Sequence, residues 1–320
     1  MPIARVEGTA DYVATMIQLT AWRAAPSFLS ALIDEWYLGP TVRQLPYFLI
    51  PWLKPEEGSE AEQTMTNATL QMLTSLASHA QHHLSEAVNK VAISTPMSLD
   101  DSQWRAYILP SVSAAGLRPI SELGDHVNAM EAAAFANGYL RCKDYTNLPA
   151  CYSELGSEPF ERVMTIQYTK SALSALFAEW LHFPEPGNSF VDTTLGAAQL
   201  SKSVRRPGAA KARYWVRLRK RLRKLRDAGQ GDVQRLVLLG ESAQDEGFLD
   251  NVKKAFAGYL PELPGDSVGS YFENTSALKV NPLFAASLGA AEMAKRALEA
   301  PKGCVEQQPC QRKRKTLTRS

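Results

Sequence analysis

The pattern of hydrophobic and polar positions predicts an alternation of helices and short buried strands. Apolar residues recur at helical spacing over residues 67–90, which indicates an amphipathic helix that leads into a strand at 91–95. Pro96 ends that strand. The small residues at 131–140 are typical of a helix that packs closely against a sheet.

A further helix is predicted between these elements, with a break inside it. Asp100 or Asp101 can cap its start, and Gly116 suits its end. Pro110 should kink or split the helix, because proline removes a backbone donor and clashes with the preceding turn.

The C-terminal half contains the most informative pattern. Residues 162–177 predict two strands joined by a turn around Thr169 and Lys170. Residues 236–248, LVLLGESAQDEGF, predict a buried strand, a glycine turn and a helix, and an alanine-rich helix follows at 281–297. A strand that stops at a glycine and opens into a helix commonly brings backbone close to a nucleotide.

Composition places the chain among globular proteins with a substantial core. It has 320 residues, of which 45% are hydrophobic and 21% charged. The net charge of +2 hides an uneven distribution, because no acidic residue lies between Asp192 and Asp227. Since the basicity is local, the charge of the chain as a whole argues against nucleic acid as a partner.

The cysteines and the apolar segments indicate in which cellular compartment the protein is expected. Four cysteines without a CxxC spacing do not predict a disulfide framework, which favours a reducing compartment and hence the cytoplasm; they are Cys142, Cys151, Cys304 and Cys310. The basic run at 312–315 offers nuclear import as an alternative. The N-terminus does not resemble a secretory signal, and the apolar patch at 47–53 is too short to span a membrane.

Several segments resemble the ATPase domain of heat-shock protein 70 in the same order along the chain. They are VAISTPMSLDDSQWRA (91–106), AAGLRPI (114–120), EAAAFANGYL (131–140), KLRDAGQGDVQRLVLLGES (224–242) and NPLFAASLGAAEMAKRA (281–297). The chain is most similar to a divergent group of fungal proteins described as heat-shock-protein-70-like or actin-like ATPase domains. These share phrases such as GYLRCKDYTN, IQYTKSALSA, LGESAQDE and PKGCVEQQPC.

The resemblance implies an α/β protein with the actin-like ATPase (ribonuclease H-like) fold, in which two α/β lobes surround a nucleotide cleft. The first lobe then comprises a shortened N-terminal part, residues 1–65, and residues 66–160. The second lobe, residues 161–300, carries the adenosine-type turn, and residues 301–320 form a disordered basic tail. The ligand implied is ATP or ADP with magnesium.

Two hairpins of this family hold the phosphates, and both are altered here. The first corresponds to Gly8 and Thr9, with Val6 at the position of the metal-binding aspartate and Glu7 beside it; the alternative is a surface turn. The second corresponds to residues 167–172, where Gln167 replaces the aspartate and the glycines are lost. An amide lacks the charge that a magnesium-bound water requires, and side chains crowd the phosphates.

Two further positions match functional residues of the family. Glu131 corresponds to the glutamate that places the attacking water, although a glutamate in the first turn of a helix also interacts favourably with the helix dipole. Gly240, Glu241 and Ser242 correspond to the turn that contacts adenosine, with Glu241 in place of a second glycine. The catalytic lysine of the family has no counterpart that we could locate.

Other candidate groups admit two interpretations each. An apolar stripe, Trp215, Leu218, Leu222 and Leu225, runs along a basic helix predicted over about 213–227. That helix is either a patch for acidic partners, nucleic acid or anionic membrane, or the solvated face of a docked helix. His79, His82 and His83 suggest a metal site by their spacing, but a polar helix face explains them as well.

The expected function is that of a degenerate ATPase domain, a pseudoenzyme that binds adenine nucleotide weakly and hydrolyses it slowly or not at all. It is expected to serve as a non-chaperone scaffold or regulatory accessory protein for an unknown protein partner. Only residues 301–320 follow the closing helix, so no peptide-binding domain is expected. One alternative is an active ATPase with a reshaped site that uses Glu131, Gly240 and Glu7. Another is an interaction protein that uses the basic helix at 213–227, accessory to a fungal metabolic pathway.

Overall fold

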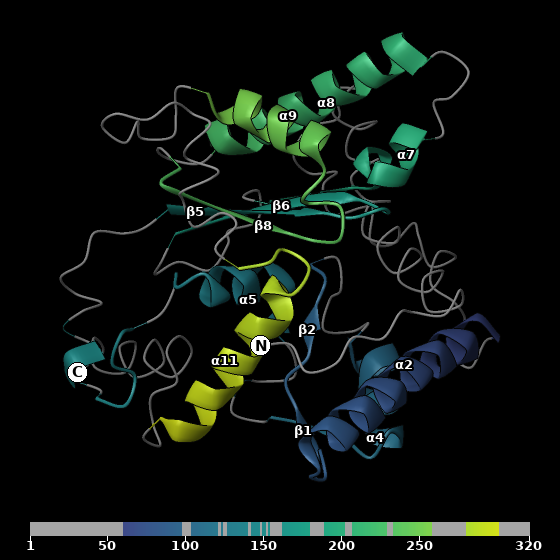
Figure 1. Cartoon of the computed structure of the whole chain (residues 1–320), viewed down its shortest axis with the longest axis vertical. Helices are drawn as coiled ribbons and strands as arrows, with labels where there is room; N and C mark the ends of the chain where they lie inside the picture. The colour runs from purple at the N-terminus through teal and green to yellow at the C-terminus, as the bar shows by residue number, and fades with distance from the viewer. Residues whose placement is uncertain are drawn as a thin grey trace, which may run out of the picture. The chain divides into compact units, whose positions relative to one another are not determined.

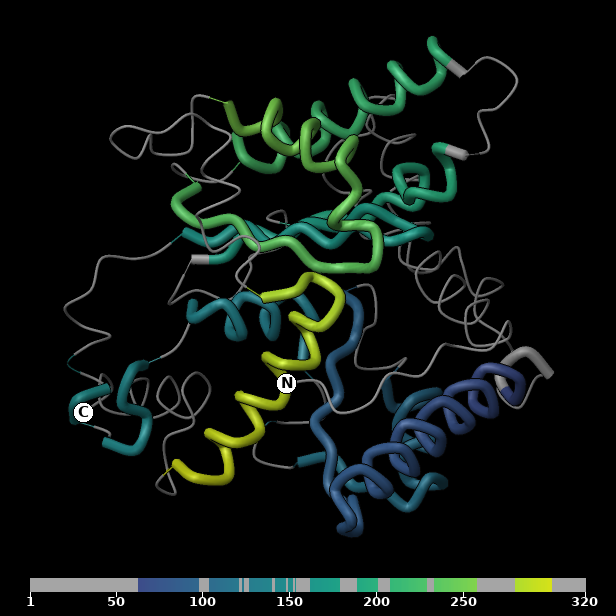
Figure 2. Tube along the Cα trace, in the orientation of Figure 1, coloured from purple at the N-terminus to yellow at the C-terminus, as the bar shows by residue number. Residues whose placement is uncertain are grey.

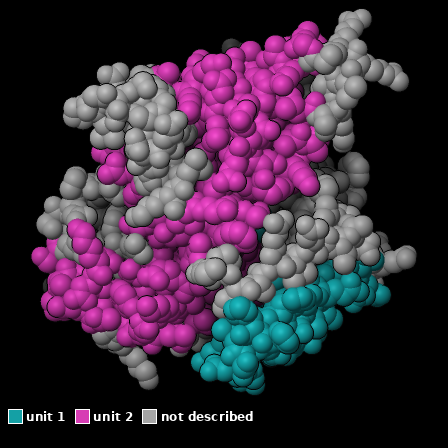
Figure 3. All heavy atoms as spheres, in the orientation of Figure 1, with its two compact units in different colours: residues 1–91, 96–119, 191–193 teal, residues 92–95, 120–190, 194–320 magenta. Residues whose placement is uncertain are grey.

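The computed structural model describes a mixed α/β protein. The described residues are 60–97, 104–120, 123, 127–139, 142–147, 149–151, 153, 162–179, 189–201, 207–228, 233–257 and 280–300. The chain forms two compact units, the smaller made of residues 1–91, 96–119 and 191–193, the larger of residues 92–95, 120–190 and 194–320 (Figure 3). The lobe boundary expected near residue 160 lies inside the larger unit.

In the smaller unit, helix α2 (Glu60–Leu84) packs against η3 (Trp104–Ile108) and α4 (Leu109–Ala114). The Ser111 hydroxyl donates hydrogen bonds to the carbonyl oxygens of Thr66 and Tyr107, at 2.9 and 2.8 Å, and so ties α4 to α2. The amphipathic helix predicted over 67–90 is confirmed, but it begins earlier and ends at Leu84.

The predicted break at Pro110 is present. The π-helical segment η3 runs directly into the α-helix α4, and Pro110 lies in the first turn of α4, just after the helix type changes. The chain leaves α4 at Gly116, which has φ of +73°. The sequence therefore located the irregularity near Pro110 and the stop at Gly116, whereas the proposed caps, Asp100 and Asp101, lie outside the described residues.

Short parallel pairs of strands replace the single strand predicted over 91–95. In the smaller unit, β1 (Lys90–Val91) pairs with β3 (Arg118–Pro119). In the larger unit, β2 (Ser94–Thr95) pairs with β4 (Val127–Asn128). Each strand has two residues, so the segment is extended but divided between two ladders.

A four-stranded sheet forms the centre of the larger unit, except that residues 191 and 192 of its edge strand are assigned to the smaller unit (Figure 1). Its strands are β5 (Arg162–Tyr168), β6 (Leu173–Glu179), β7 (Ser189–Asp192) and β8 (Arg235–Leu239), in the order β7-β6-β5-β8. β5 and β6 form the antiparallel hairpin that the sequence predicts, and β8 runs parallel to β5. Connections between parallel strands require a crossover, and α7 (Ala197–Ser201) and α8 (Pro207–Ala228) lie in this one.

Helices cover both faces of this sheet (Figures 1 and 2). On one face, α8 packs against β6 and against α9 (Glu246–Phe256). The predicted apolar stripe of the basic helix is buried there, in a core shared with the sheet; the stripe residues are Trp215, Leu218, Leu222 and Leu225. Tyr168 of β5 stacks on Phe248 of α9 with ring centroids 4.2 Å apart. The stripe therefore docks the helix on the sheet, as the second interpretation of the basic helix expects.

The other face is covered by α5 (Ala129–Ala136), and α11 (Ala285–Glu299) packs against α5. The Asn128 side chain caps α5 by accepting a hydrogen bond of 2.9 Å from the Met130 N–H. Gly289 of α11 lies against the backbone of Ala132, so closely that a Cβ atom at position 289 would overlap the Ala132 carbonyl oxygen. Small residues on both helices make this close crossing possible.

Gly289→Ala should destabilise the protein by about 1–3 kcal/mol, because the added methyl group has to separate two packed helices. Gly208 of α8 provides the matched control, since a Cβ atom there meets nothing within 4 Å. Gly208→Ala should leave stability unchanged or raise it by up to about 1 kcal/mol. Urea unfolding followed by circular dichroism measures both, and equal effects of the two substitutions would contradict the close crossing.

Candidate functional site

Two turns that the sequence assigns to nucleotide binding lie together at one edge of the sheet. They are the β5–β6 turn, residues 169–172, and the turn that follows β8, residues 240–244. Because β5 and β8 are parallel neighbours, their carboxyl ends meet at the same edge. The sheet topology therefore brings together two of the predicted binding segments.

Gly240 makes a close approach, but to protein backbone. It has φ of +107°, and a Cβ atom there would overlap the carbonyl oxygen of Tyr168. Its N–H donates a hydrogen bond of 3.1 Å to the Pro282 carbonyl, and the Ser242 N–H donates one of 3.2 Å to the Tyr168 carbonyl. These two N–H groups of the turn are therefore engaged inside the protein.

Glu241 joins the two turns. Its carboxylate accepts a hydrogen bond of 2.7 Å from the backbone N–H of Lys170. An N–H in such a turn is the kind of donor that binds phosphate oxygens, and here it is bound to an internal anion. The sequence places Glu241 beside adenosine, whereas the structure places its carboxylate on the opposite hairpin.

The remainder of the β5–β6 turn is closed by its own side chains. The Ala172 N–H donates to the Thr169 hydroxyl oxygen at 3.1 Å, and that oxygen lies 3.0 Å from the Ser171 hydroxyl. The carbonyls of Thr169 and Lys170 accept hydrogen bonds from the N–H groups of residues 197 and 198. The hairpin is thus a packed turn, and the Lys170 side chain is exposed.

Glu131 lies in the first turn of α5, which packs against β5 and β8. Its side chain is partly buried and makes no hydrogen bond or ion pair with any residue that the structure describes. Burial raises the pKa of the Glu131 carboxyl above its usual value. A carboxyl group with a raised pKa is a candidate proton acceptor, but no hydrogen bond links it to either turn.

The remaining predicted site residues lie partly outside the part of the chain that the structure describes. Gly8 and Thr9, with the adjacent Glu7, lie outside the described residues. Within the described residues, no group of three or more His, Cys, Asp or Glu side chains could hold a metal ion. Nδ1 of His79 lies 2.7 Å from the Ser75 carbonyl, one turn earlier in α2. None of the described helices has the length and apolar character needed to cross a membrane.

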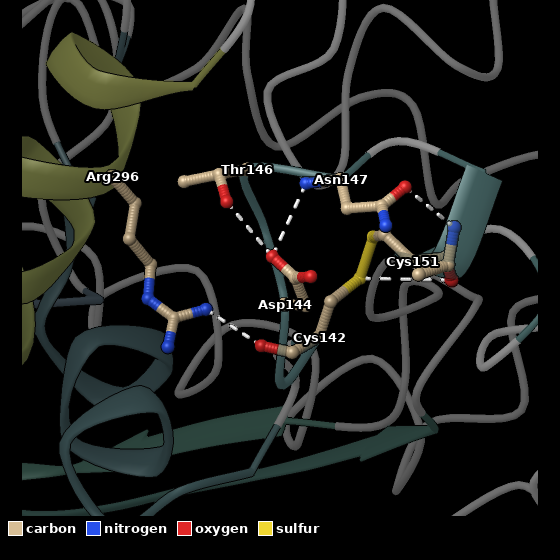
Figure 4. Close-up of a disulfide and its surroundings, with 7 residues drawn as sticks. Cys142, Asp144, Thr146, Asn147, Cys151 and Arg296 are labelled. Atoms are coloured by element: carbon tan, nitrogen blue, oxygen red, sulfur yellow. Dashed lines mark hydrogen bonds between the residues drawn. A yellow bond between two sulfur atoms is a disulfide. The ribbon is translucent and has the colours of Figure 1, made fainter.

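A disulfide joins Cys142 to Cys151, with their Cα atoms 5.3 Å apart (Figure 4). The expectation drawn from the cysteines is incorrect for this pair, since it included no bridge. Asp144 shapes the enclosed loop by accepting hydrogen bonds from the Thr146 hydroxyl at 2.8 Å and the Asn147 N–H at 3.2 Å. The separation of nine residues matches no motif, so only the folded geometry reveals the pairing.

Arg296 of α11 anchors this loop, and the sequence analysis missed it (Figure 4). Its guanidinium donates a hydrogen bond of 2.8 Å to the Cys142 carbonyl and forms an ion pair of 2.8 Å with Glu292. It also lies over the rings of Phe135 and Tyr145, 5.1 and 4.4 Å from their centroids. An arginine near the end of a helix is so common that its sequence position gives no sign of burial.

Comparison with protein-family models gives no match, and comparison with curated proteins gives none either. The site is therefore interpreted from its own geometry.

Glu131→Gln should stabilise the protein at neutral pH. Because the folded-state pKa of Glu131 is raised, its protonated form supports folding at low pH, and that contribution is lost as the pH rises through the folded-state pKa. The variant should lose this part of the pH dependence of the melting temperature. Glu246→Gln, in the first turn of α9, is the control and should lower stability by about 0.3–1 kcal/mol. A Glu131→Gln variant that melts below wild type at pH 8 would contradict the assignment.

Replacing Cys142 and Cys151 together by serine should lower the free energy of unfolding by about 2–3 kcal/mol, the value expected for a loop of this length. Dithiothreitol should lower the melting temperature of wild type toward that of the double variant and leave the double variant unchanged. Equal melting temperatures of wild type with and without the reductant would show that the bridge does not form in solution.

Proposed function

We propose that the protein is a non-hydrolysing relative of the actin-like ATPase domains and that it works as a scaffold or regulatory partner of another protein. The observation that carries this proposal is the 2.7 Å hydrogen bond between the Lys170 N–H and the Glu241 carboxylate. It occupies a backbone donor of the phosphate-type hairpin with an anion that belongs to the protein. A hairpin whose Lys170 N–H is bound to an internal carboxylate favours a structural role.

The electrostatics support the same conclusion. A nucleotide phosphate entering between the turns would meet the negative charge of Glu241 and would have to displace it from Lys170. Gln167 offers no negative charge for magnesium, so the metal that normally neutralises the phosphates has no carboxylate at this position. Both effects lower the affinity for ATP.

The arrangement of the larger unit is compatible with the proposed ancestry. Its mixed sheet has helices on both faces, as an α/β lobe requires, and the two predicted binding turns meet at one edge. Gly240 preserves the close packing of that edge. The fold can thus be retained for its shape and surface while the phosphate contacts are lost.

An active ATPase with a reshaped site is the second candidate. The observation in its favour is the partly buried carboxyl of Glu131, which has a raised pKa and no hydrogen bond or ion pair with a described residue. In that case the carboxyl group would accept a proton from the attacking water. The rate of phosphate release from ATP, measured for wild type and for Glu131→Gln, distinguishes the active ATPase from the non-hydrolysing scaffold.

The proposal predicts no ATP turnover above the uncatalysed rate and little or no heat on calorimetric titration with magnesium-ATP at millimolar concentration. Turnover that Glu131→Gln abolishes would overturn it in favour of the second candidate.

Glu241→Gly should bind ATP at least about fivefold more tightly than wild type, because it removes the negative charge and frees the Lys170 N–H. Glu241→Gln is the matched control, since it loses the charge but keeps an oxygen that can accept from Lys170. Its affinity should lie between the other two. Equal affinities of all three proteins would show that Glu241 is not what excludes the nucleotide.

A further inference from the structure

Helix α8 has two opposite faces, and only one of them is used by the fold. The apolar stripe is buried in the core of the larger unit. The opposite face carries an exposed basic row, which we define as Arg213, Arg217, Lys220 and Lys224. At about 100° and 1.5 Å per residue, these four positions lie within about 60° of one another and extend over about 16 Å of the helix.

A different set of arginines on α8 contributes to holding the helix in place. Arg219 donates to the Asn251 side chain, Arg223 donates to the Lys254 carbonyl at 2.9 Å, and Arg226 donates to the Ala255 carbonyl at 2.7 Å. All three acceptors belong to α9. The basic row does not share in these contacts with α9, so docking against α9 does not explain its charges.

The basic row is not neutralised by nearby acidic groups among the described residues. Arg217 donates a hydrogen bond of 2.5 Å to the Thr194 hydroxyl, which is neutral. Arg213, Lys220 and Lys224 form no ion pair with any described residue. Asp250 of α9 is paired with Lys254, at 2.7 Å. Four positive charges therefore lie along one exposed line.

The surroundings of the basic row distinguish between classes of polyanion. A helix that enters a membrane surface needs an exposed apolar face. The apolar face of α8 is buried, and Val216 is a single exposed apolar side chain on the described part of this helix. A specific protein interface needs aromatic or other large anchors at its centre, and the row has none. A phosphodiester backbone requires only a line of positive charges.

We propose that the basic row of α8 binds the phosphate backbone of nucleic acid without sequence preference. Phosphates follow at about 3.4 Å of axis per strand, so a row of about 16 Å spans about five of them, enough for each of its four cations. The sequence argued against nucleic acid because its basic residues are concentrated in one segment, but contact with a phosphate backbone needs no more than one such row. The basic row includes none of the residues of the proposed nucleotide-type turns.

Fluorescence anisotropy with a 20-base-pair DNA duplex, measured from 20 to 200 mM salt on the full chain, tests this surface. Wild type should bind with a Kd of about 10⁻⁴ to 10⁻⁶ M near physiological salt, and log K should fall linearly with log salt. Replacing all four residues of the row by glutamine should reduce the magnitude of that slope by about 3–4, about 0.9 for each cation. Glutamine keeps helix propensity high, and circular dichroism verifies folding.

The control replaces four exposed basic residues elsewhere, Lys90, Arg105, Arg118 and Lys295, by glutamine. It changes the net charge equally and should change the slope by less than about 1. The proposal is overturned if wild type does not bind the duplex at 20 mM salt, or if both quadruple variants lose the same affinity. Equal or tighter binding of phosphatidylserine vesicles or poly-glutamate through the same four residues would instead assign the row to a membrane or an acidic protein.

Discussion

The close contact between the turn after β8 and the end of β5 organises the larger unit. Gly240 allows the backbone to pass over the Tyr168 carbonyl, and that carbonyl then accepts a hydrogen bond from the Ser242 N–H. The same residue, Tyr168, stacks on Phe248 and lies within hydrogen-bonding distance of the Tyr214 hydroxyl, at 3.0 Å. One strand end thus positions a turn and two helices. A residue with a side chain at position 240 would disturb all of them.

This contact also determines what the edge of the sheet can do chemically. In a site that binds phosphate, turns at strand ends leave N–H groups directed at the ligand. Here the N–H groups of Lys170, Gly240 and Ser242 donate to Glu241, Pro282 and Tyr168. The hydrogen bonds that would serve a ligand instead hold the turns to each other and to the adjoining chain. The same backbone N–H groups could bind a ligand or stabilise the turns, and in this structure they donate hydrogen bonds within the protein.

The opposite side of the sheet is organised by close helix packing and a buried cation. The crossing of α5 and α11 at Ala132 and Gly289 brings their backbones together, and Arg296 then reaches the disulfide loop from the last turns of α11. A buried guanidinium requires several partners to offset its desolvation, and Arg296 has a carbonyl, a carboxylate and two rings. The loop is therefore fixed from within by its bridge and from outside by α11.

The sequence by itself determined the local elements: the split at Pro110, the β5–β6 hairpin, the strand and glycine turn at Leu239 and Gly240, and the apolar stripe of α8. These follow from periodicity, proline geometry and backbone preference, which act over a few residues. It could not determine that Glu241 contacts Lys170, that Cys142 pairs with Cys151, or that Arg296 is buried, because each depends on segments brought together from separate parts of the chain. The tertiary structure alone decided which N–H groups were already occupied and which basic side chains of α8 remained exposed.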